Sequence, residues 1–233
     1  GVGAGMYNLN QSSPTLTDVS FSSNVGDYEG GGAMVNGTES SPTLKNVIFT
    51  NNLGGGMVND GGSNPSLTNV IFSGNSSMMG GGMFNRESSP TLSEVIFNGN
   101  SGSRGGGMYN ILSDPVLVNV TFSGNTVTAY PEISSFIGEG GGMYNTRSDP
   151  VITNVTFSEN TASVTGGGMY NTDISKPLMT NVTIWGNTAG TSGGGIANIP
   201  LVSSSPVIPT LINVILWGNN APTGAGLYNT DVG

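Results

Sequence analysis

Two aspartates are the residues of this sequence best placed to act together in chemistry. Asp114 and Asp149 each stand directly before a proline, at the same position in two neighbouring copies of a repeat. Two carboxylates stacked close together could bind Ca²⁺ or share one proton. The competing interpretation is structural, because aspartate is favoured at such turns. We expect no cofactor, with Ca²⁺ at this pair as the one metal to consider.

The rest of the composition argues against catalysis. The 233-residue chain has no histidine and no cysteine, so it lacks the commonest general base and any thiolate metal ligand. Glycoside hydrolysis needs two carboxyl groups at a defined separation, whereas Asp18 and Glu94 are isolated in their rows. The glycine triplets are not followed by the Lys-Ser/Thr of a phosphate-binding loop. We predict no catalytic residues and a protein that is not an enzyme, with a polysaccharide lyase or hydrolase as the alternative.

The distribution of charged and apolar residues argues against a nucleic-acid partner and against membrane insertion. The formal net charge is −9, and the five basic residues are scattered along the chain. Nucleic-acid binding needs clustered Lys and Arg, so we expect no nucleic-acid partner. No apolar run is long enough to cross a bilayer, so we expect no membrane insertion.

Two motifs alternate strictly along the chain and define the repeat. A proline lies between them in each copy, and the shortest spacing, from Asn36 to Asn59, is 23 residues. The first motif, Gly-Gly-Gly-Met-Tyr-Asn, ends at Asn8, Asn36, Asn59, Asn85, Asn110, Asn145, Asn171, Asn198 and Asn229. The second motif, Asn-Val-x-Phe-x-x-Asn, closes at Asn24, Asn52, Asn75, Asn100, Asn125, Asn160, Asn187 and Asn219.

The repeat length decides the architecture. Each copy of about 25 residues holds three short β-prone segments separated by Gly, Asn, Ser or Pro, and none is long enough for a helix. Three strands and three corners make one triangular coil, and successive coils stack at about 4.8 Å. We therefore predict an all-β fold, a single-stranded right-handed parallel β-helix of about nine coils, as one domain over residues 1–233.

Period-2 alternation predicts which side chains point inward. In Val19-Ser20-Phe21 the valine and the phenylalanine face the interior, and later copies repeat this pair down to Val214 and Leu216. A second inward row runs from Leu16 to Leu211, and a third is the methionine row from Met6 to Leu227. Stacked identical side chains form dry ladders.

The two asparagine rows are given a structural role. An amide both donates and accepts, so asparagines at the same corner of successive coils can bond along the stack. Asparagine also tolerates the left-handed backbone of tight corners, which we expect these rows to adopt. The glycine triplet is expected to supply a corner with positive φ and then a closely packed strand.

The alternating motifs resemble those of the polymorphic outer membrane protein family. The residues concerned are Gly-Gly-Gly-Met with Phe-Ser-Gly-Asn, the latter at 72–75 and 122–125. Members of that family carry paired Phe-x-x-Asn and Gly-Gly-Ala-aliphatic motifs on a β-helical passenger. The resemblance covers essentially the whole chain and implies a secreted, surface-exposed adhesin, with an extracellular or cell-surface location in a bacterium.

Outward positions offer candidate interaction surfaces. The position after each inward valine is Ile48, Ile71 and Ile96 in three successive coils, and Trp185 and Trp217 share one outward position and should stack. The position after methionine includes Tyr109, Tyr144 and Tyr170. We expect these rows on outer faces, where contiguous apolar surface marks an interaction site. The alternative is that they only stabilise the sheet.

Insertions interrupt the period at 25–29, 126–139 and 199–208. Insertions in solenoids form loops at the coil edge. The 126–139 loop contains Tyr130 and Phe136, which we expect to cover an outer face or to contact a partner.

The two ends of the sequence share one phase of the repeat, since Met6-Tyr7-Asn8 and Leu227-Tyr228-Asn229 occupy equivalent positions. End-to-end self-association into filaments follows as a hypothesis. The predicted function is an extracellular structural or surface-interaction rod whose partner is a second copy, a carbohydrate or a host or cell surface. The alternative is a polysaccharide-binding or polysaccharide-cleaving protein.

Overall fold

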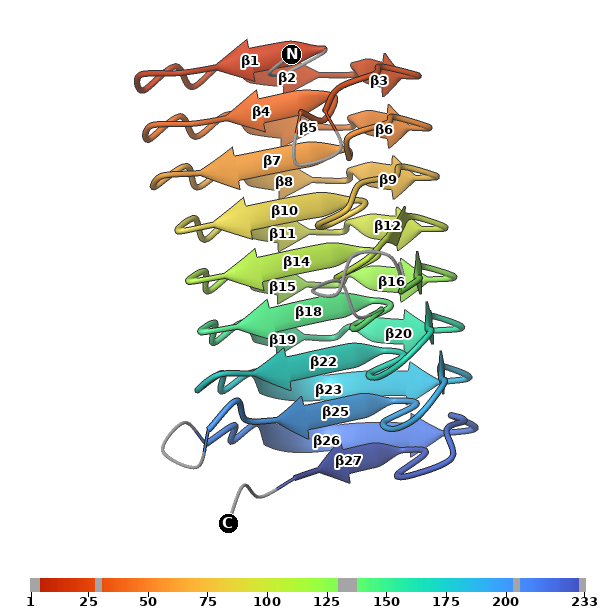
Figure 1. Cartoon of the computed structure of the whole chain (residues 1–233). Helices are drawn as coiled ribbons and strands as arrows, with labels where there is room; N and C mark the ends of the chain where they lie inside the picture. The colour runs from red at the N-terminus through yellow and green to blue at the C-terminus, as the bar shows by residue number, and fades with distance from the viewer. Residues whose placement is uncertain (1–4, 28–30, 130–137, 203–205, 231–233) are drawn as a thin grey trace.

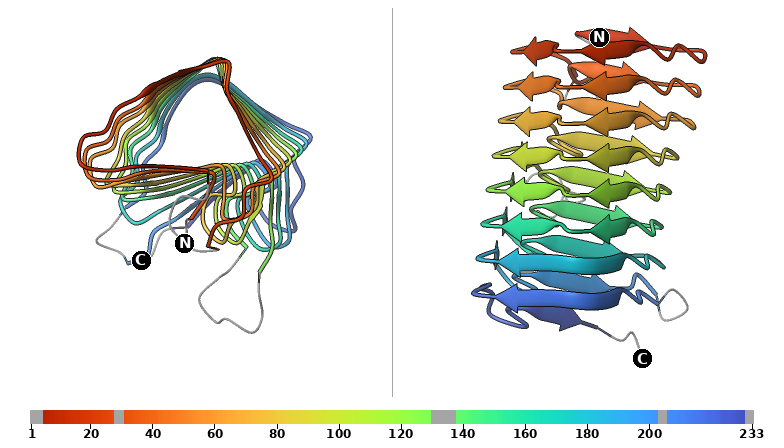
Figure 2. Two further views of the ribbon diagram at one scale, coloured as in Figure 1. Left: turned by 90° about the horizontal axis from the view of Figure 1, so that it is seen from above. Right: turned by 180° about the vertical axis from the view of Figure 1, so that it is seen from behind.

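Every regular element of the chain is a β-strand in the computed structural model, which describes residues 5–27, 31–129, 138–202 and 206–230 (Figure 1). The strands stack in parallel along one axis, and the coil seen from above is triangular (Figure 2). Within the described ranges no helix is long and apolar enough to cross a membrane. The predicted right-handed parallel β-helix is confirmed.

One side of the solenoid is a nine-stranded parallel sheet in which each strand pairs with its equivalent in the next coil. Nine strands bound eight complete turns, one fewer than the nine coils predicted. The strands are β1 (Met6–Asn8), β4 (Met34–Asn36), β7 (Met57–Asp60), β10 (Met83–Arg86), β14 (Met108–Ile111), β18 (Met143–Thr146), β22 (Met169–Thr172), β25 (Ile196–Ile199) and β27 (Leu227–Asn229).

The other two sides form a 14-stranded sheet. Its first ladder is β2 (Thr15–Thr17), β5 (Thr43–Lys45), β8 (Ser66–Thr68), β11 (Thr91–Ser93), β15 (Val116–Val118) and β19 (Val151–Thr153). Its second ladder is β3 (Ser20–Ser22), β6 (Ile48–Thr50), β9 (Ile71–Ser73), β12 (Ile96–Asn98), β16 (Thr121–Ser123) and β20 (Thr156–Ser158). The long strand β23 (Leu178–Trp185) joins the two ladders and pairs with β26 (Thr210–Trp217).

A short four-stranded sheet follows the second ladder. It consists of β13 (Ser101–Gly102), β17 (Thr126–Val127), β21 (Thr161–Ala162) and β24 (Thr188–Ala189). Val127, Ala162 and Ala189 form a small buried cluster here. From this sheet the chain crosses back to the next strand of the nine-stranded sheet.

The interior is filled by the predicted rows of identical side chains. The rings from Phe21 to Phe157 stack in one column, with centroids 4.7–5.0 Å apart and planes within 5°. The inner methionines from Met34 to Met169 are fully buried. Stacked rings at this spacing keep each coil in register with the next while removing apolar surface from water.

Two buried asparagine ladders run the length of the rod beside these rows. In the first, from Asn8 to Asn229, each amide Nδ2 donates to the Oδ1 of the next coil at 2.7–2.8 Å. In the second, from Asn24 to Asn219, each Oδ1 accepts both the backbone N–H and the Nδ2–H of the preceding coil's asparagine. From Asn52 onward, the Nδ2 of this second row also donates to a phenylalanine or isoleucine carbonyl of the coil before it.

The expected left-handed backbone of these two rows is wrong. Positive φ falls instead on the residue before the second ladder, such as Asn51 or Gly124, and on a third, outer row that includes Asn46 and Asn119. The ladder asparagines have ordinary backbone conformations because their amides, rather than their dihedral angles, are what the corner requires. The left-handed turn is made by the neighbouring residue, which is often glycine or asparagine.

The glycine triplets combine two requirements. Gly105, the first of its triplet, has a φ of 59°, a conformation that glycine adopts without strain. A Cβ on Gly107, the third, would lie 2.6 Å from the Gly142 carbonyl oxygen and 2.8 Å from the Phe122 ring. The triplet therefore makes a left-handed corner and then lets the strand pass close to the phenylalanine column.

Removing one rung of the second ladder should be strongly destabilising. Asn100→Ala takes away the acceptor of the Asn75 backbone and amide donors, together with the donor to the Phe72 carbonyl. Each buried group left unsatisfied costs about 1–3 kcal/mol, so we expect a loss of at least about 3 kcal/mol in urea denaturation. Asn98→Ala, at an exposed outward position two residues away, is the matched control and should change stability by less than about 0.5 kcal/mol. Equal losses at both positions would contradict the ladder's role.

Candidate functional site: an outer groove on the nine-stranded sheet

The outer face of the nine-stranded sheet carries two rows of side chains. The row after methionine runs Tyr7, Val35, Val58, Phe84, Tyr109, Tyr144 and onward, and the row after the ladder asparagine runs Leu9, Gly37, Asp60, Arg86, Ile111 and onward. Both rows follow the register of the strands, so equivalent residues lie one strand spacing apart.

The expectation that Tyr109, Tyr144 and Tyr170 are exposed is wrong. Their relative exposures are 5%, 6% and 4%, and they belong to a second apolar cluster on the outside of the sheet. From Met79 onward, the chain crossings that precede the strands pair from coil to coil, and Arg104 of one crossing lies over the Tyr144 ring. The paired residues are Met79, Arg104, Glu139, Thr165, Ser192 and Thr223.

Charged residues of this covering wall lie directly on the aromatic row. The Arg104 guanidinium lies 5.6 Å from the centre of the Tyr144 ring, and its Nε is 3.8 Å from Glu139 Oε2. The Tyr170 hydroxyl hydrogen-bonds to the Glu139 carboxylate. Glu139 closes the 126–139 insertion, so this insertion returns to the wall through a buried ion pair. Tyr130 and Phe136, its predicted contact residues, lie outside the described part of the chain.

Burial raises the pKa of Glu139 to about 6, although Arg104 and the Tyr170 hydroxyl lower it. Burial, reinforced by the Glu139 charge, also raises the pKa values of Tyr144 and Tyr170. The tyrosines therefore stay neutral, and Glu139 is the member of this cluster that changes charge near neutrality.

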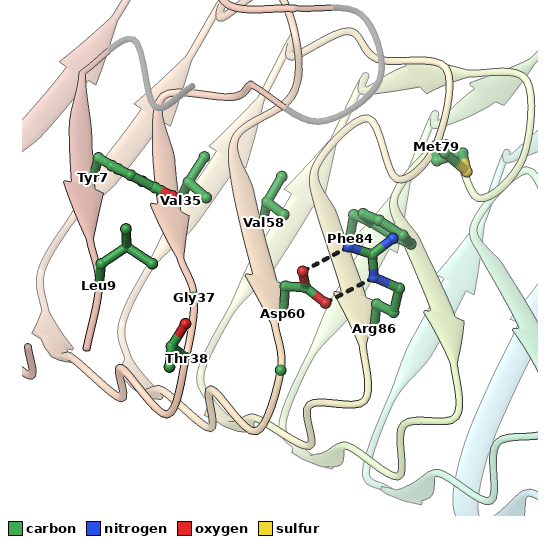
Figure 3. A pocket seen from close by; sticks show the side chains of 11 residues that line it. Tyr7, Leu9, Val35, Gly37, Thr38, Val58, Asp60, Met79, Phe84 and Arg86 are labelled. Carbon is green, nitrogen blue, oxygen red and sulfur yellow. Dashed lines mark hydrogen bonds and ion pairs between the residues drawn. The ribbon is translucent and has the colours of Figure 1, made fainter. Parts of the chain in front are cut away.

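The chain crossing that precedes β7 is the shortest of the crossings between described strands, and a groove lies beside it. Four residues, 53–56, separate Asn52 from Met57, whereas seven, 76–82, separate Asn75 from Met83 in the next coil. A groove of about 450 Å³ crosses the sheet here, lined by Tyr7, Leu9, Val35, Gly37, Thr38, Val58, Asp60, Gly61, Met79, Phe84 and Arg86 (Figure 3). A volume of this size is within the range of small-molecule sites.

Side-chain size shapes the groove. Val35, Gly37 and Val58 are small, and they lie between Tyr7 and Leu9 on one side and Phe84 and Arg86 on the other (Figure 3). Valine replaces the tyrosine found at this position in β14, β18 and β22, and glycine leaves a gap in the second row. The depression therefore follows from both the short crossing and the small side chains.

One ion pair forms the polar wall of the groove. Arg86 Nε donates to Asp60 Oδ1 at 2.7 Å and its Nη2 donates to Asp60 Oδ2 at 2.6 Å, a two-pronged contact (Figure 3). The side chains remain 53% and 36% exposed. The hydrogen bond from Arg86 lowers the pKa of Asp60, so this carboxylate stays ionised.

The other predicted sites are placed as follows. Ile48 and Ile96 are exposed at 41% and 42%, with Ile71 partly exposed between them on the second ladder of the 14-stranded sheet. Trp185 and Trp217 are in register on β23 and β26, as their shared position in the repeat predicts. Together with Thr183 and Ile215 they line a shallow apolar pocket of about 300 Å³.

Asp114 and Asp149 serve the backbone of neighbouring coils. The Asp149 N–H donates to Asp114 Oδ1, and the Lys176 N–H donates to Asp149 Oδ1, both at 2.6 Å. In earlier coils the backbone N–H of the next coil donates in the same way to the side-chain oxygen of Ser13, Ser41, Asn64 or Ser89. The two aspartates therefore continue an outer ladder. In the described ranges no three acidic side chains gather as a metal site. A parallel buried serine ladder, two residues before each proline, was missed, although Ser-x-Pro recurs in the sequence.

Comparison with known proteins assigns the family. Residues 3–130, more than half of the chain, match the family described as the right-handed beta helix region, and the chain belongs to it. No curated protein and no solved structure matches the chain.

Because Glu139 is buried, the unfolding free energy of the chain should depend on pH. Its folded-state pKa of about 6 is above the ordinary 4.5, so its contribution to stability is full below pH 4.5 and is lost as the pH rises through 6. Relative to Glu139→Gln, the unfolding free energy of the native chain should fall by about 2 kcal/mol between pH 4 and pH 7.5. Urea denaturation at the two pH values measures this difference. Glu159→Gln, at an exposed position, should show no such change; parallel behaviour of the two variants would refute the assignment.

Proposed function

We propose that the chain is an extracellular or cell-surface rod without catalytic activity that binds a partner sideways through the groove of the nine-stranded sheet. The observation that carries this proposal is the groove itself, a depression on the outer face of the nine-stranded sheet with a charged, partly exposed ion pair along one side. The repeats resemble those of bacterial polymorphic outer membrane proteins, which supports a surface location and an adhesive role for this member of the β-helix family.

The rigidity of the sheet that carries the groove favours binding. The groove residues project from strands whose inner side chains are stacked methionines and a buried amide ladder. A site on such a scaffold loses little freedom when a partner binds, which strengthens binding.

Binding is favoured over polysaccharide cleavage at this groove. A glycosidase needs one carboxyl group that stays protonated to donate to the leaving oxygen. Asp60 is held in its ionised form by Arg86, so it is unsuited to that role. A polysaccharide partner is therefore more consistent with the groove as a ligand than as a substrate.

Filling the groove should abolish adhesion. Val58→Tyr places at this position the residue that β14, β18 and β22 carry there, so the coil should still fold. We expect at least about a tenfold loss in the retention of fluorescently labelled chain on intact bacterial and cultured animal cells. Val151→Tyr, the same substitution at an exposed site on the 14-stranded sheet, is the control and should bind as the native chain does. No retention of the native chain, or equal retention of Val58→Tyr, would refute the proposal.

End-to-end association is a second candidate function, favoured by the strand edges at the ends of the described stack. β1 and β27 are the outermost strands of one sheet, and Tyr7 and Asn8 of β1 are equivalent to Tyr228 and Asn229 of β27. An open edge in this register can accept a further coil, either from more of the same chain or from a second copy.

Light scattering and negative-stain electron microscopy of residues 1–233 test this association. Stacking predicts a mass that grows with concentration and unbranched fibres. A constant monomer mass up to millimolar concentration would rule out filament formation by this part of the chain.

A further inference from the structure

We propose that the outer face of the first ladder of the 14-stranded sheet binds ice, through two parallel rows made largely of threonine, serine and valine. We call this surface the threonine-rich face. It consists of the outward-pointing residues, two for each strand, along β8, β11, β15, β19 and the first halves of β23 and β26. It lies on a different sheet from the groove, so this activity does not depend on the proposed groove binding.

Strand register makes the threonine-rich face periodic in two directions. Each outward residue pairs with its equivalent in the next coil, so Ser66, Thr91 and Val116 lie in one row. The second row runs beside it, without a shift of register, from Thr68 to Ile212. Neighbours in a row are about 4.8 Å apart and the two rows are about 6.6 Å apart. Seen from behind, these strands stack evenly in one column (Figure 2). The surface of ice is also a periodic array, so a regular face can match it at many positions at once.

Both rows are accessible, in contrast to the covered tyrosines of the nine-stranded sheet. The first outward residue of each of the six strands is exposed, and the second is exposed or partly exposed. Even the apolar members Val116 and Val151 have exposures of 37% and 38%. Water or ice can therefore contact the whole length of the face.

The residue types suit a lattice of water. Seven of the twelve positions are threonine or serine, whose hydroxyl groups both donate and accept hydrogen bonds, as each water of ice does. The methyl groups between them restrict the orientations of first-shell water. Nine of the twelve residues are β-branched and therefore stiff at χ1. Val116 and Val151 have the shape of threonine, so they keep the surface even where the hydroxyl is missing. Such a preordered array loses little freedom on binding.

Charge and area favour ice over a macromolecular partner. None of the twelve side chains is charged, and Lys45, the charged member of the same rows, lies on β5 beyond one end of the face. An uncharged face complements an uncharged lattice. Six strands with three residues each span about 24 Å by about 10 Å, or about 240 Å². A standard protein complex buries about 800 Å² on each partner, so this face is too small to hold a second copy of the chain.

Thermal hysteresis and uptake into ice test the proposal. The chain of residues 1–233 would be cooled around a single ice crystal in a nanolitre osmometer. In a second assay, fluorescently labelled chain would be frozen slowly onto an ice surface beside labelled serum albumin. We expect the freezing point to lie below the melting point, and the labelled chain to enter the ice from which albumin is excluded.

Four variants locate the activity. Thr91→Tyr and Val151→Tyr place rings that protrude from the threonine-rich face, so both should lose thermal hysteresis and ice uptake. Ile96→Tyr is the matched control, because this residue is 42% exposed on the second ladder of the same coil as Thr91, and it should keep both signals. Val58→Tyr, on the other sheet, should keep them too. Circular dichroism and urea denaturation confirm that each variant is folded.

The outcomes separate ice binding from groove binding. Absence of both signals in the native chain would overturn the ice proposal, whatever the result for cell retention. Full activity of Thr91→Tyr and Val151→Tyr, or an equal loss in Ile96→Tyr, would show that the threonine-rich face is not the site. A loss of cell retention in Val58→Tyr with intact ice uptake would support two independent sites.

Discussion

The buried asparagine ladders are the interaction on which the rest of this structure depends. Each amide has its partners in the coils directly above and below, so its hydrogen bonds are satisfied only when neighbouring coils are in register. An apolar column alone, such as the stacked phenylalanines, tolerates small slips of one coil against the next. A buried amide tolerates none without leaving a donor or acceptor unpaired. The ladders therefore fix the register of the coils, and the apolar rows supply the gain from burial.

Because the ladders fix the register of the strands, the number of residues in each coil can vary. Asn36 and Asn59 are bonded across a separation of 23 residues, and Asn110 and Asn145 across 35, at the same 2.8 Å distance. In the sequence, the additional residues fall between Asn125 and the next strand of the nine-stranded sheet. Two longer crossings bring Arg104 and Glu139 onto the outer aromatic row, whereas the short crossing at 53–56 lies beside the groove. The surface of the rod is thus set by crossing length, independently of its core.

The sequence predicted the buried rows, which the repeat determines, but it did not predict which outer side chains are covered, because that depends on how the crossings fold. Val47, Phe49 and Met57 are buried as the period-2 pattern predicts, because a strand's inner face follows from alternation alone. Tyr109 is on the outer face as predicted, yet it is covered, because alternation does not reveal that another segment folds over that face. The left-handed turn fell on Asn51 rather than on Asn52, since either residue could make the corner. Asp60 and Arg86 each follow a ladder asparagine in consecutive coils, a signal from which their contact could have been found.

Transplanting one crossing tests most directly whether ladder register is independent of crossing length. Residues 53–56 would be replaced by the seven residues 76–82 of the next coil, and the crystal structure of the variant determined. The account predicts the same asparagine pairs on either side, Asn36 with Asn59 and Asn52 with Asn75, at unchanged distances, with the new crossing folded over Val58 and the groove filled. Broken or shifted asparagine pairs, or a groove that stays open beneath the longer crossing, would contradict it.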